Sequence, residues 1–405
     1  MAVSVQAPPA APAWAKRLFT IGVTGTNGKT STTSAVAALL GELGRPVARM
    51  TTLGAFLDET RLEVGPNYAG FIETMRRGLK AGGRYAALEL TSEALALGFA
   101  RAWPCQIGVF TNLTLDHSDA HPTPEHYLAS KAQLFIALPA GGSAVLNARD
   151  PNAALLAEVL GSGVELIGYG VPSRGELWTK PELAARSIRV GVDGTHFEIE
   201  DSGRFPGLPR SWSIRAIGEV FVENALAALG AALAASVPPE RAAAVLASIA
   251  PPPGRFQLLC ERPYVVVDYA HTPDALERTL ATGRKLCSGR LTVVFGAGGG
   301  RDRAKRPLLG AAAGKADRIV LTADNPRNED PAAIADEIAA GIGAHADVVR
   351  ELDRKRAIEL ALRDAGADDW ILILGKGHEQ HQEVAGIKTA FSDEAIVREL
   401  TRVPR

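Results

Sequence analysis

The stretch TIGVTGTNGKTSTTSAV, from Thr20 to Val36, combines residue types that together can bind a phosphate group. Gly25 and Gly28 let the backbone curl so that several N–H groups point at one anion, and the helix predicted to follow adds its N-terminal dipole. Lys29 would reach the outer phosphates, and Thr30 would place its hydroxyl on a bound magnesium ion. The predicted nucleotide-binding residues are Gly25, Thr26, Asn27, Gly28, Lys29, Thr30 and Ser31.

This stretch departs from the full G-x-x-x-x-G-K-[ST] pattern, because Val23 stands where the first glycine belongs. A glycine turn that only joins a strand to a helix is the alternative interpretation. We favour nucleotide binding, because strand, Gly-Lys-Thr and helix occur together as the binding mechanism requires.

Further candidates for metal chemistry follow the next predicted strands. Glu89 ends one apolar run, where its carboxylate could bind magnesium directly or through water. A loop after the following run contains Asp116, His117, Asp119 and His121. Such a cluster is often only a solvated turn, but its place after a strand beside the phosphate loop favours a metal site. Lys131 lies on a predicted amphipathic helix near the same end, and an ordinary surface lysine is its alternative interpretation.

Charged residues also follow several strands in the second half of the chain. VVVDYAHTPDAL places Asp268 and His271 at a strand end, and FGAGGGRDRAKRPLLG combines a glycine run with cations. TADNPRNEDP and LILGKGHEQ close two further strands. A basic run such as RDRAKR is usually a solvated face. Four charged loops at the carboxyl ends of parallel strands instead indicate a ligand site at that edge.

The elements that position these residues follow an α/β rhythm. Apolar strand-length runs alternate with helical stretches, which predicts a mostly parallel, doubly wound sheet. Short alternating segments over 164–213 predict an antiparallel β extension, and PPPGR is the expected domain boundary. We therefore expect a flexible N-terminal arm over 1–17, a central nucleotide-binding domain over 18–250 and a C-terminal α/β domain over 251–405. The predicted strands lie near 17–23, 45–53, 85–90, 106–113 and 143–148, then near 264–270, 290–298, 317–324, 346–349 and 370–377.

Composition is typical of an enzyme of the cytoplasm. The chain has 405 residues and a formal net charge of −1, which excludes a chain-wide basic footprint for nucleic acid. Its 3 cysteines are scattered without metal-ligand spacing and read as reduced thiols. No apolar run reaches transmembrane length, and the Ala/Pro-rich start lacks the pattern of a signal peptide.

A series of motifs in order resembles the Mur ligase family, and within it the MurE-type UDP-N-acetylmuramoyl-tripeptide synthetases. The motifs are GTNGKTST, TNLTLDH, HYLASKAQLF, VLNARD, GRF, DYAHTPDAL, GAGGGRDRAKRPLLG, DNPRNEDP and GKGHE. The resemblance implies a P-loop-type central ATPase domain and a Rossmann-like C-terminal domain. It also implies a reaction in which ATP phosphorylates a carboxylate and an amine attacks the acyl phosphate, forming an amide and releasing ADP and phosphate.

The resemblance assigns catalytic and metal roles residue by residue. Thr30 and Glu89 would serve one magnesium site and His117 a second. Lys131 corresponds to a lysine that carries a carbamate, which would make it an anionic metal ligand. With Lys29, which offsets charge on the transferring phosphoryl group, these residues form the implied catalytic centre.

The resemblance also implies the remaining ligand contacts. Asn224 and Asp268 correspond to positions near the adenine and ribose, and Arg255 and His271 to positions beside the ATP phosphates. DNPR resembles the diaminopimelate-selecting form, in which the arginine pairs with the distal carboxylate of the amino acid. The implied amino-acid site consists of Asp324, Asn325, Arg327, Gly375 and Glu379.

Departures from the family concern the acceptor. MurE-type enzymes have an N-terminal domain for the uridine nucleotide, and we expect it to be absent, since about seventeen residues precede the first strand. The family's Glu-x-Ser-Ser-His segment has Glu93 in place of the histidine, and Phe99 replaces an arginine, although Arg101 is close by. The family's Thr-Thr-Pro acceptor segment has no clear counterpart in VGPNYAGFIETM.

Three hypotheses follow from these matches and departures. The leading one is a stand-alone ATP- and Mg²⁺-dependent amide ligase that joins a small carboxylate acceptor without a UDP-sugar to an amino acid resembling diaminopimelate. The second is peptidoglycan tripeptide synthesis, with the missing domain dispensable or supplied by a partner protein. The third is a catalytically silent nucleotide-binding regulatory protein.

Overall fold

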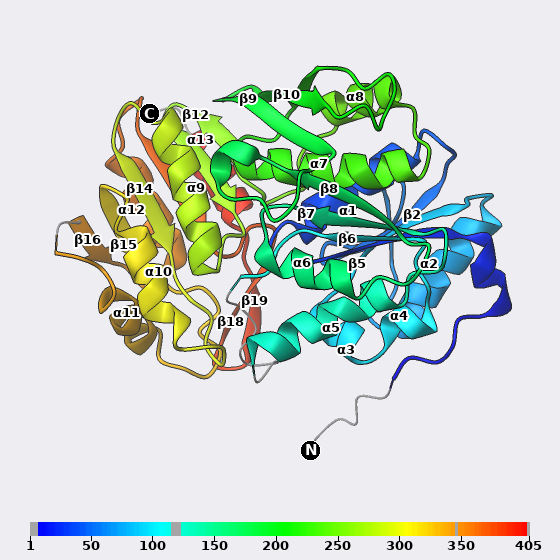
Figure 1. Cartoon of the computed structure of the whole chain (residues 1–405). Helices are drawn as coiled ribbons and strands as arrows, with labels where there is room; N and C mark the ends of the chain where they lie inside the picture. The colour runs from blue at the N-terminus through cyan, green and yellow to red at the C-terminus, as the bar shows by residue number, and fades with distance from the viewer. Residues whose placement is uncertain (1–6, 115–122, 345–346, 403–405) are drawn as a thin grey trace. The chain divides into compact units, whose positions relative to one another are not determined.

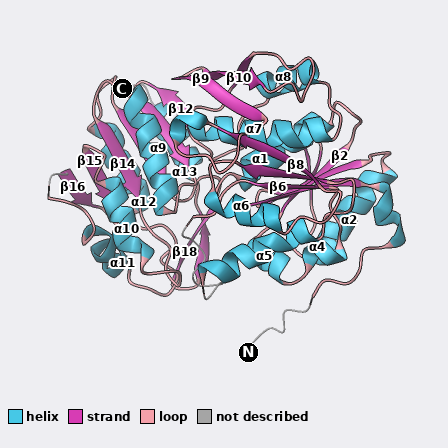
Figure 2. Ribbon diagram, viewed as in Figure 1, coloured by secondary structure: helices cyan, strands magenta, loops and turns pink. Residues whose placement is uncertain are grey.

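The computed structural model describes residues 7–114, 123–344 and 347–402. These residues form two compact units, divided between Ala250 and Pro251. Each unit has its own sheet and its own hydrophobic core (Figure 1). The helices and strands of both units are distinguished in Figure 2.

Unit 1 is built on a doubly wound parallel sheet, as predicted. Its parallel strands are β1 (Phe19–Thr24), β2 (Val47–Thr51), β5 (Tyr85–Glu89), β6 (Ile107–Phe110), β7 (Ser143–Asn147) and β8 (Glu165–Gly170). In the sheet they lie in the order β8-β7-β6-β1-β5-β2. The carboxyl ends of β1, β5 and β6 therefore meet at one edge, where the predicted phosphate loop and Glu89 lie.

Further strands, joined to one another in antiparallel pairs, extend this sheet on both sides. They are β9 (Leu183–Gly191), β10 (Gly194–Asp201) and β11 (Ser211–Ile214) on one side, and β3 (Gly54–Leu57) and β4 (Thr60–Leu62) on the other. The expected antiparallel extension over 164–213 needs correction at its start, because β8 is largely buried and pairs in parallel with both β7 and β9. Antiparallel pairing begins between β9 and β10. The β3–β4 hairpin was not predicted, since short edge strands with exposed polar residues carry little periodic signal.

Helices cover both faces of this sheet. They are η1 (Ala13–Arg17), α1 (Lys29–Leu40), α2 (Tyr68–Lys80), α3 (Ser92–Ala96), α4 (Phe99–Ala102), α5 (Pro124–Ile136), α6 (Pro151–Glu158), η2 (Pro172–Arg174), α7 (Glu219–Ala234) and α8 (Pro239–Ser248). α1 packs on α7 at one face, and α5 and α6 lie at the other (Figure 1). The Ala-rich α7 approaches the strands closely, since a Cβ at Gly230 would lie 2.9 Å from the Val145 side chain. Small residues thus let α7 pack closely on the sheet.

The N-terminal stretch is more ordered than predicted. The Ala11 N–H donates to the Ala102 carbonyl over 2.9 Å. The Trp14 ring packs edge-on against Trp103, with ring centroids 5.9 Å apart. The flexible arm expected over 1–17 therefore needs correction where the structure describes it, because buried aromatic surface and a backbone hydrogen bond hold the chain on unit 1.

Unit 2 is a Rossmann-like α/β fold, as predicted. Its sheet has the order β12-β13-β17-β14-β15-β16, in which only β12 is antiparallel to its neighbour. The strands are β12 (Gln257–Glu261), β13 (Tyr264–Asp268), β14 (Leu291–Phe295), β15 (Arg318–Leu321), β16 (Asp347–Arg350) and β17 (Trp370–Leu374), with a separate hairpin of β18 (His381–Val384) and β19 (Ile387–Ala390). The helices are α9 (Pro273–Leu286), α10 (Lys305–Ala313), α11 (Pro331–Ala339), α12 (Arg354–Arg363) and α13 (Asp393–Arg402).

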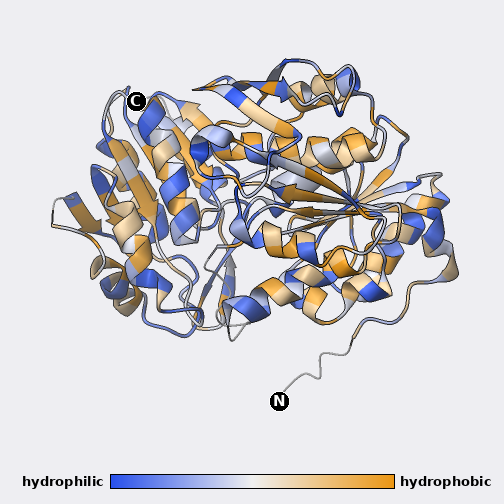
Figure 3. Ribbon diagram, viewed as in Figure 1, coloured by the Kyte–Doolittle hydropathy of each residue, from blue (hydrophilic) through white to orange (hydrophobic). Residues whose placement is uncertain are grey.

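The central strands of unit 2 consist mainly of hydrophobic residues, orange in Figure 3, and are buried along nearly their whole length. Val265 and Val267 belong to the core cluster that α12 and α13 complete. Leu372 faces the other way, where a Cβ at Gly283 of α9 would lie 3.0 Å from it. Burial on both faces explains the near-continuous apolar runs from which these strands were predicted.

Two further predictions concern the whole chain. All 3 cysteines are free thiols, and Cys105 is buried. In the part of the chain that the structure describes, no helix has the length and apolar character needed to cross a bilayer.

Candidate functional site

The phosphate loop of unit 1 requires glycine at two positions. Gly25 has φ 146° and Gly28 has φ 84°, both in the region that favours glycine. A Cβ at Gly25 would overlap the Thr111 hydroxyl, and one at Gly28 would overlap the Asn224 amide oxygen. The structure thereby places Asn224, a predicted nucleotide contact, directly against the loop.

The end of β6 holds the loop in shape. The Thr26 N–H donates to the Asn112 carbonyl over 2.8 Å, and the Asn27 N–H donates to Asn112 Oδ1 over 2.9 Å. The Thr111 hydroxyl donates to the Asn27 carbonyl over 2.7 Å. Thr111 and Asn112 were not among the predicted site residues. Their position in the TNL motif after a strand was the available signal.

Lys29 turns its ammonium back over this loop. Its Nζ donates to the Thr26 carbonyl over 2.8 Å and to the Gly25 carbonyl over 3.1 Å. Gly28 is the N-cap residue of α1 and has no side chain with which to cap the helix. The N–H groups of the first turn and the Lys29 ammonium therefore lie at the same end of α1. This arrangement suits a phosphate group. Ser31, the last predicted residue of the loop, is half-buried in that turn.

Thr30 and Glu89 provide oxygen atoms beside the loop. The Thr30 hydroxyl donates to Glu89 Oε2 over 2.9 Å, and the Thr52 N–H donates to the same oxygen over 3.1 Å. Hydroxyl and carboxylate oxygens are the ligands that magnesium prefers. These two residues therefore fit a magnesium ion accompanying a bound nucleotide.

Lys131 is buried rather than on the surface. It is 1 % exposed, its Nζ donates to the Gly25 carbonyl over 2.8 Å, and the Nζ lies 4.2 Å from the centroid of the Tyr127 ring. The surface-lysine interpretation is therefore wrong. Carbamylation of Lys131 stays a prediction.

The loop with Asp116, His117, Asp119 and His121 lies outside the described residues. Among the residues that are described, no three His, Cys, Asp or Glu side chains gather as a metal site.

In unit 2, Arg255 and His271 are brought together by an aromatic ring that was not predicted. The Arg255 guanidinium lies 4.4 Å from the centroid of the Tyr269 ring, and the His271 ring centroid lies 4.5 Å from it. The His378 ring follows at 5.1 Å. Burial and the positive charge of Arg255 lower the pKa of His378 to about 4, so this imidazole is neutral at pH 7. The position of Tyr269 between two motif residues was the only sequence signal for it.

Asp268 holds backbone in place. Its Oδ2 accepts from the Phe256 N–H over 2.5 Å, and its Oδ1 accepts from the Ala270 N–H over 2.8 Å. Burial raises the pKa of this carboxyl, although these hydrogen bonds oppose the rise. In the structure Asp268 joins the turn at 254–256 to the end of β13, and its contact with the ribose stays a prediction.

The predicted amino-acid site forms one cavity of about 190 Å³ in unit 2. Its lining includes all of the predicted residues, which are Asp324, Asn325, Arg327, Gly375 and Glu379. His271 and Arg301 also line it. Residues from the ends of β13, β14, β15 and β17 thus converge, as the strand-end argument required.

Arg327 has a fixed backbone and a directed side chain. Its φ is 53°, and its N–H donates to the Glu383 carbonyl over 3.0 Å. Its Nη1 donates to the Gly299 carbonyl over 2.6 Å, and its Nε lies 3.8 Å from a Glu383 carboxylate oxygen. The hairpin β18–β19 and the glycine loop after β14 therefore position this guanidinium.

Two carboxylates of the cavity differ in their environment. Burial raises the pKa of Asp324, against which Gly375 packs so closely that a Cβ there would lie 2.6 Å from Oδ2. Burial also acts on Glu379, but the charge of Lys376 and hydrogen bonds from Lys376 and Asn325 outweigh it and lower the pKa of Glu379. Glu379 is thus an anion at neutral pH, facing the same cavity as Arg327.

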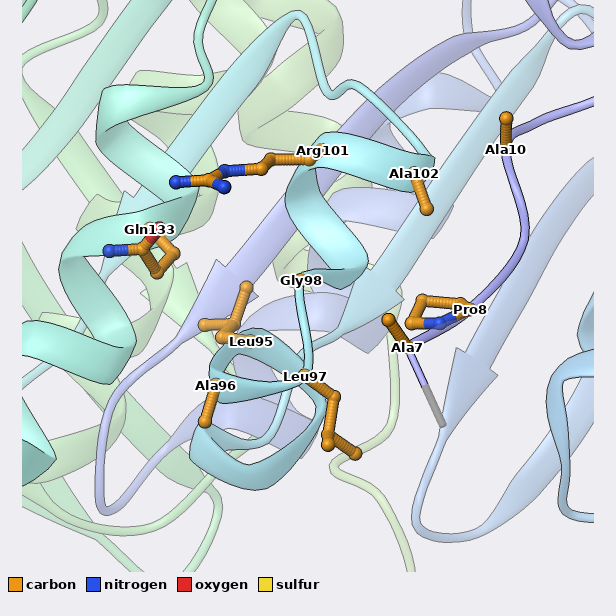
Figure 4. Close-up of a pocket in the computed structure, with 10 residues that line it drawn as sticks. All are labelled: Ala7, Pro8, Ala10, Leu95, Ala96, Leu97, Gly98, Arg101, Ala102 and Gln133. Atoms are coloured by element: carbon orange, nitrogen blue, oxygen red, sulfur yellow. The ribbon is translucent and has the colours of Figure 1, made fainter. Parts of the chain in front are cut away.

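The segment that departs from the family lies on α3 and α4. Phe99, in place of an arginine, packs edge-on against Phe71 with ring centroids 5.1 Å apart. Glu93 lies in the first turn of α3, beside Ser92. Arg101 lines a surface hollow of about 470 Å³ together with Gln133 and the N-terminal stretch (Figure 4).

Comparison with known proteins explains why these features occur together. Residues 23–232 match the model of the Mur ligase middle domain, and residues 254–377 match that of the Mur ligase glutamate ligase domain. A UDP-N-acetylmuramoyl-L-alanyl-D-glutamate–2,6-diaminopimelate ligase of Aquifex aeolicus is 38 % identical over 392 residues, covering 95 % of this chain and 78 % of that protein.

Solved structures agree with this assignment. A UDP-N-acetylmuramoyl-L-alanyl-D-glutamate–2,6-diaminopimelate ligase superposes with a TM-score of 0.64 at 32 % identity, covering 95 % of this chain and 78 % of that one. A folylpolyglutamate synthase of Mycobacterium tuberculosis shares the fold, with a TM-score of 0.71 at 20 % identity over 96 % of this chain and 92 % of its own. The chain therefore belongs to the Mur ligase family of ATP-dependent, ADP-forming ligases.

Proposed function

We propose that this enzyme forms an amide bond between the carboxylate of a small acceptor and an amino acid that carries a second charged group, as diaminopimelate does. ATP would transfer its terminal phosphoryl group to the acceptor carboxylate. The amine would then attack the acyl carbon, lose a proton and displace inorganic phosphate. ADP, phosphate and the amide are the products.

The observation that carries the choice of amine is the cavity of about 190 Å³ that Arg327 and Glu379 share. A planar guanidinium binds a carboxylate through two parallel hydrogen bonds, and an ionised carboxylate binds an ammonium group. Opposite charges in one small cavity select a zwitterionic group over an apolar side chain. Diaminopimelate has such a zwitterion at each end.

In unit 1, the two lysines and the oxygen atoms of Thr30 and Glu89 would bind the phosphates and the magnesium ion. The Lys29 ammonium and the first turn of α1 would bind the phosphates, offsetting negative charge that grows during transfer. Thr30 and Glu89 would hold the magnesium ion that the nucleotide brings. Lys131, as a carbamate, would add a further anionic ligand.

For the acceptor, we propose a carboxylate without a UDP-sugar. Support comes from the segment 93–99, where Glu93 and Phe99 differ from the residues that the family resemblance implies. Phe99 cannot bind an anion and is packed into an aromatic cluster, and Glu93 adds a negative charge that repels an acceptor with a diphosphate group more strongly than a small carboxylate. The alternative is the UDP-linked muramoyl dipeptide, favoured by the 38 % identity to the Aquifex aeolicus ligase.

One experiment tests the reaction and the acceptor together. ADP release is measured with meso-diaminopimelate and either the UDP-linked dipeptide or a panel of small carboxylates, and products are identified by mass spectrometry. We expect amide formation with a small carboxylate and poor turnover of the UDP-linked dipeptide. Efficient turnover of the latter by the purified chain would establish the alternative acceptor. Nucleotide binding without ADP release for any pair would favour a catalytically silent protein.

A further inference from the structure

Lys376 is a fully buried lysine in the turn after β17. Its side chain is 0 % exposed, and it lies between Gly375 and Gly377 in the GKGHE motif. Both glycines have positive φ, 108° and 51°. A Cβ at Gly377 would lie 2.7 Å from the Tyr269 side chain. The turn therefore needs two backbone conformations that favour glycine. It directs the Lys376 side chain into the protein.

The buried ammonium contacts three residues that line the amino-acid cavity. Its Nζ donates to Glu379 Oε2 over 2.9 Å and to Asn325 Oδ1 over 3.1 Å, and it lies 3.8 Å from Asp324 Oδ1. The Asn325 amide donates to the same Glu379 oxygen over 2.8 Å. A buried charge is tolerated only when it is paired and hydrogen-bonded, and this network meets both conditions.

The two oxygens of Glu379 therefore differ. Oε2 accepts from both Lys376 and Asn325, whereas no hydrogen bond from the described residues to Oε1 is found. Two donors on one oxygen fix the plane of the carboxylate. The other oxygen is left for a ligand in the cavity.

We propose that Lys376 is a positioning residue of the amino-acid site, whose ammonium holds Oε2 of Glu379 so that Oε1 receives the ammonium group of the substrate. This inference rests on the proposed function, in which Glu379 binds that group. Lys376 does not touch the substrate. It acts through Glu379 and, through Asn325 Oδ1, on the orientation of the Asn325 amide.

The charges around Glu379 support this role. Asp324 is buried beside Glu379 and repels it, whereas Arg354 and His381 attract it. His378 precedes Glu379 and is neutral at pH 7, so it adds no compensating charge there. Without Lys376, burial and Asp324 would favour a protonated Glu379, which cannot pair with an ammonium group.

The first test is a direct titration that needs no substrate. The Glu379 carboxyl is followed by ¹³C NMR of the full chain labelled at glutamate Cδ, with Glu379→Gln identifying its signal. In the native protein, Lys376 lowers the pKa of Glu379, so the carboxylate is lost only as pH falls through that lowered value. In Lys376→Met we expect the titration to move up by one pH unit or more. An unchanged titration would overturn the proposal.

The second test measures binding of meso-diaminopimelate by calorimetry at pH 7. We expect Lys376→Met and Glu379→Gln each to weaken binding at least tenfold, and the double variant to lose less than threefold beyond Glu379→Gln. Lys355→Met, which removes an exposed lysine paired with Glu399 over 3.1 Å, is the matched control and should bind like the native protein.

The outcomes distinguish a failure of the proposed amine from a failure of the positioning role of Lys376. Native affinity in Glu379→Gln, or no binding by the native chain, would refute the proposed amine, and the titration would still decide whether Lys376 acts on Glu379. Weak binding by Glu379→Gln but native affinity in Lys376→Met would overturn the positioning role. The double variant removes both charges together, so it gives a folded comparison even where Lys376→Met does not fold. A further tenfold loss in it would show that Lys376 acts independently of Glu379.

Discussion

Lys29 and Lys131 come from different helices, yet both donate to the Gly25 carbonyl, over 3.1 and 2.8 Å. Two ammonium groups at one carbonyl oxygen repel each other unless an anion is close. A bound phosphate group would relieve this repulsion at Lys29, and carbamylation would relieve it at Lys131 by replacing a cation with an anion. The two predicted roles are therefore complementary at the scale of single residues.

Lys29→Ala should lower the rate of ADP release by about 100-fold or more, because the ammonium offsets charge that develops in the transition state. The fold should persist, since the side chain is only partly buried. Circular dichroism checks the fold and steady-state kinetics the rate. Near-native turnover by a folded variant would refute this assignment.

Lys131→Ala should be nearly inactive and partly rescued by acetate, because a short carboxylate can replace the missing anionic ligand. Intact-mass measurement of the native protein, under conditions that retain the carbamate, should show the added carbon dioxide. An active variant together with an unmodified amine would leave Lys131 as a buried structural lysine.

At the scale of elements, the phosphate loop is shaped as much by β6 as by its own glycines. Asn112 accepts from two loop N–H groups, and Thr111 occupies the space beside Gly25. The loop is therefore rigid before a nucleotide arrives, so less conformational entropy is lost on binding.

Gly25→Ala should weaken ATP binding strongly, because the new Cβ would overlap the Thr111 hydroxyl at φ 146°. Gly82→Ala is the matched control. Gly82 has φ 94°, but a Cβ there meets nothing within 4 Å, so this variant has backbone strain without a clash. Calorimetric titration with a non-hydrolysable ATP analogue compares the two. Equal affinities would show that the loop tolerates the displacement.

Elements with strong local sequence patterns could be predicted from the sequence. Features that depend on tertiary contacts could not. Strands such as β1 and β17 are near-continuous apolar runs, and glycines and prolines mark their ends. The β3–β4 hairpin has no such signal. The helical pattern around Lys131 fits an exposed or a buried position equally well, and only packing against the Tyr127 ring and the Gly25 carbonyl distinguishes them.

The candidate site shows the same division between local and tertiary information. Motifs indicated Arg327 and Glu379, whose residue types suit charged ligands. Lys376 and Tyr269 lie inside the motifs GKGHE and DYAHTPDAL, but the motifs did not single them out, because each contacts another side chain and that contact forms only in the fold.

At the scale of the whole molecule, the two units divide the chemistry. Unit 1 contains the phosphate loop with Lys29, and unit 2 contains the amino-acid cavity with Arg327. The phosphate loop is formed by residues of unit 1 and the amino-acid cavity by residues of unit 2, although the predicted nucleotide contacts also include Arg255, Asp268 and His271 of unit 2. A substitution at Lys29 or Arg327 should therefore leave affinity for the other ligand unchanged while still slowing the overall reaction.

Arg327→Asn is the variant that tests this division in unit 2, because asparagine tolerates φ 53° and removes the guanidinium without straining the backbone. We expect it to weaken meso-diaminopimelate binding at least tenfold and to leave the affinity for an ATP analogue within about twofold. Lys29→Ala should show the reverse pattern, and both variants should form the amide far more slowly than the native protein. Calorimetry with each ligand and mass spectrometry of the product measure these quantities. If Arg327→Asn weakened the binding of both ligands equally, binding of the amino acid and of the nucleotide would be energetically coupled. The effect of each residue would then belong to the assembled reaction site rather than to its own unit.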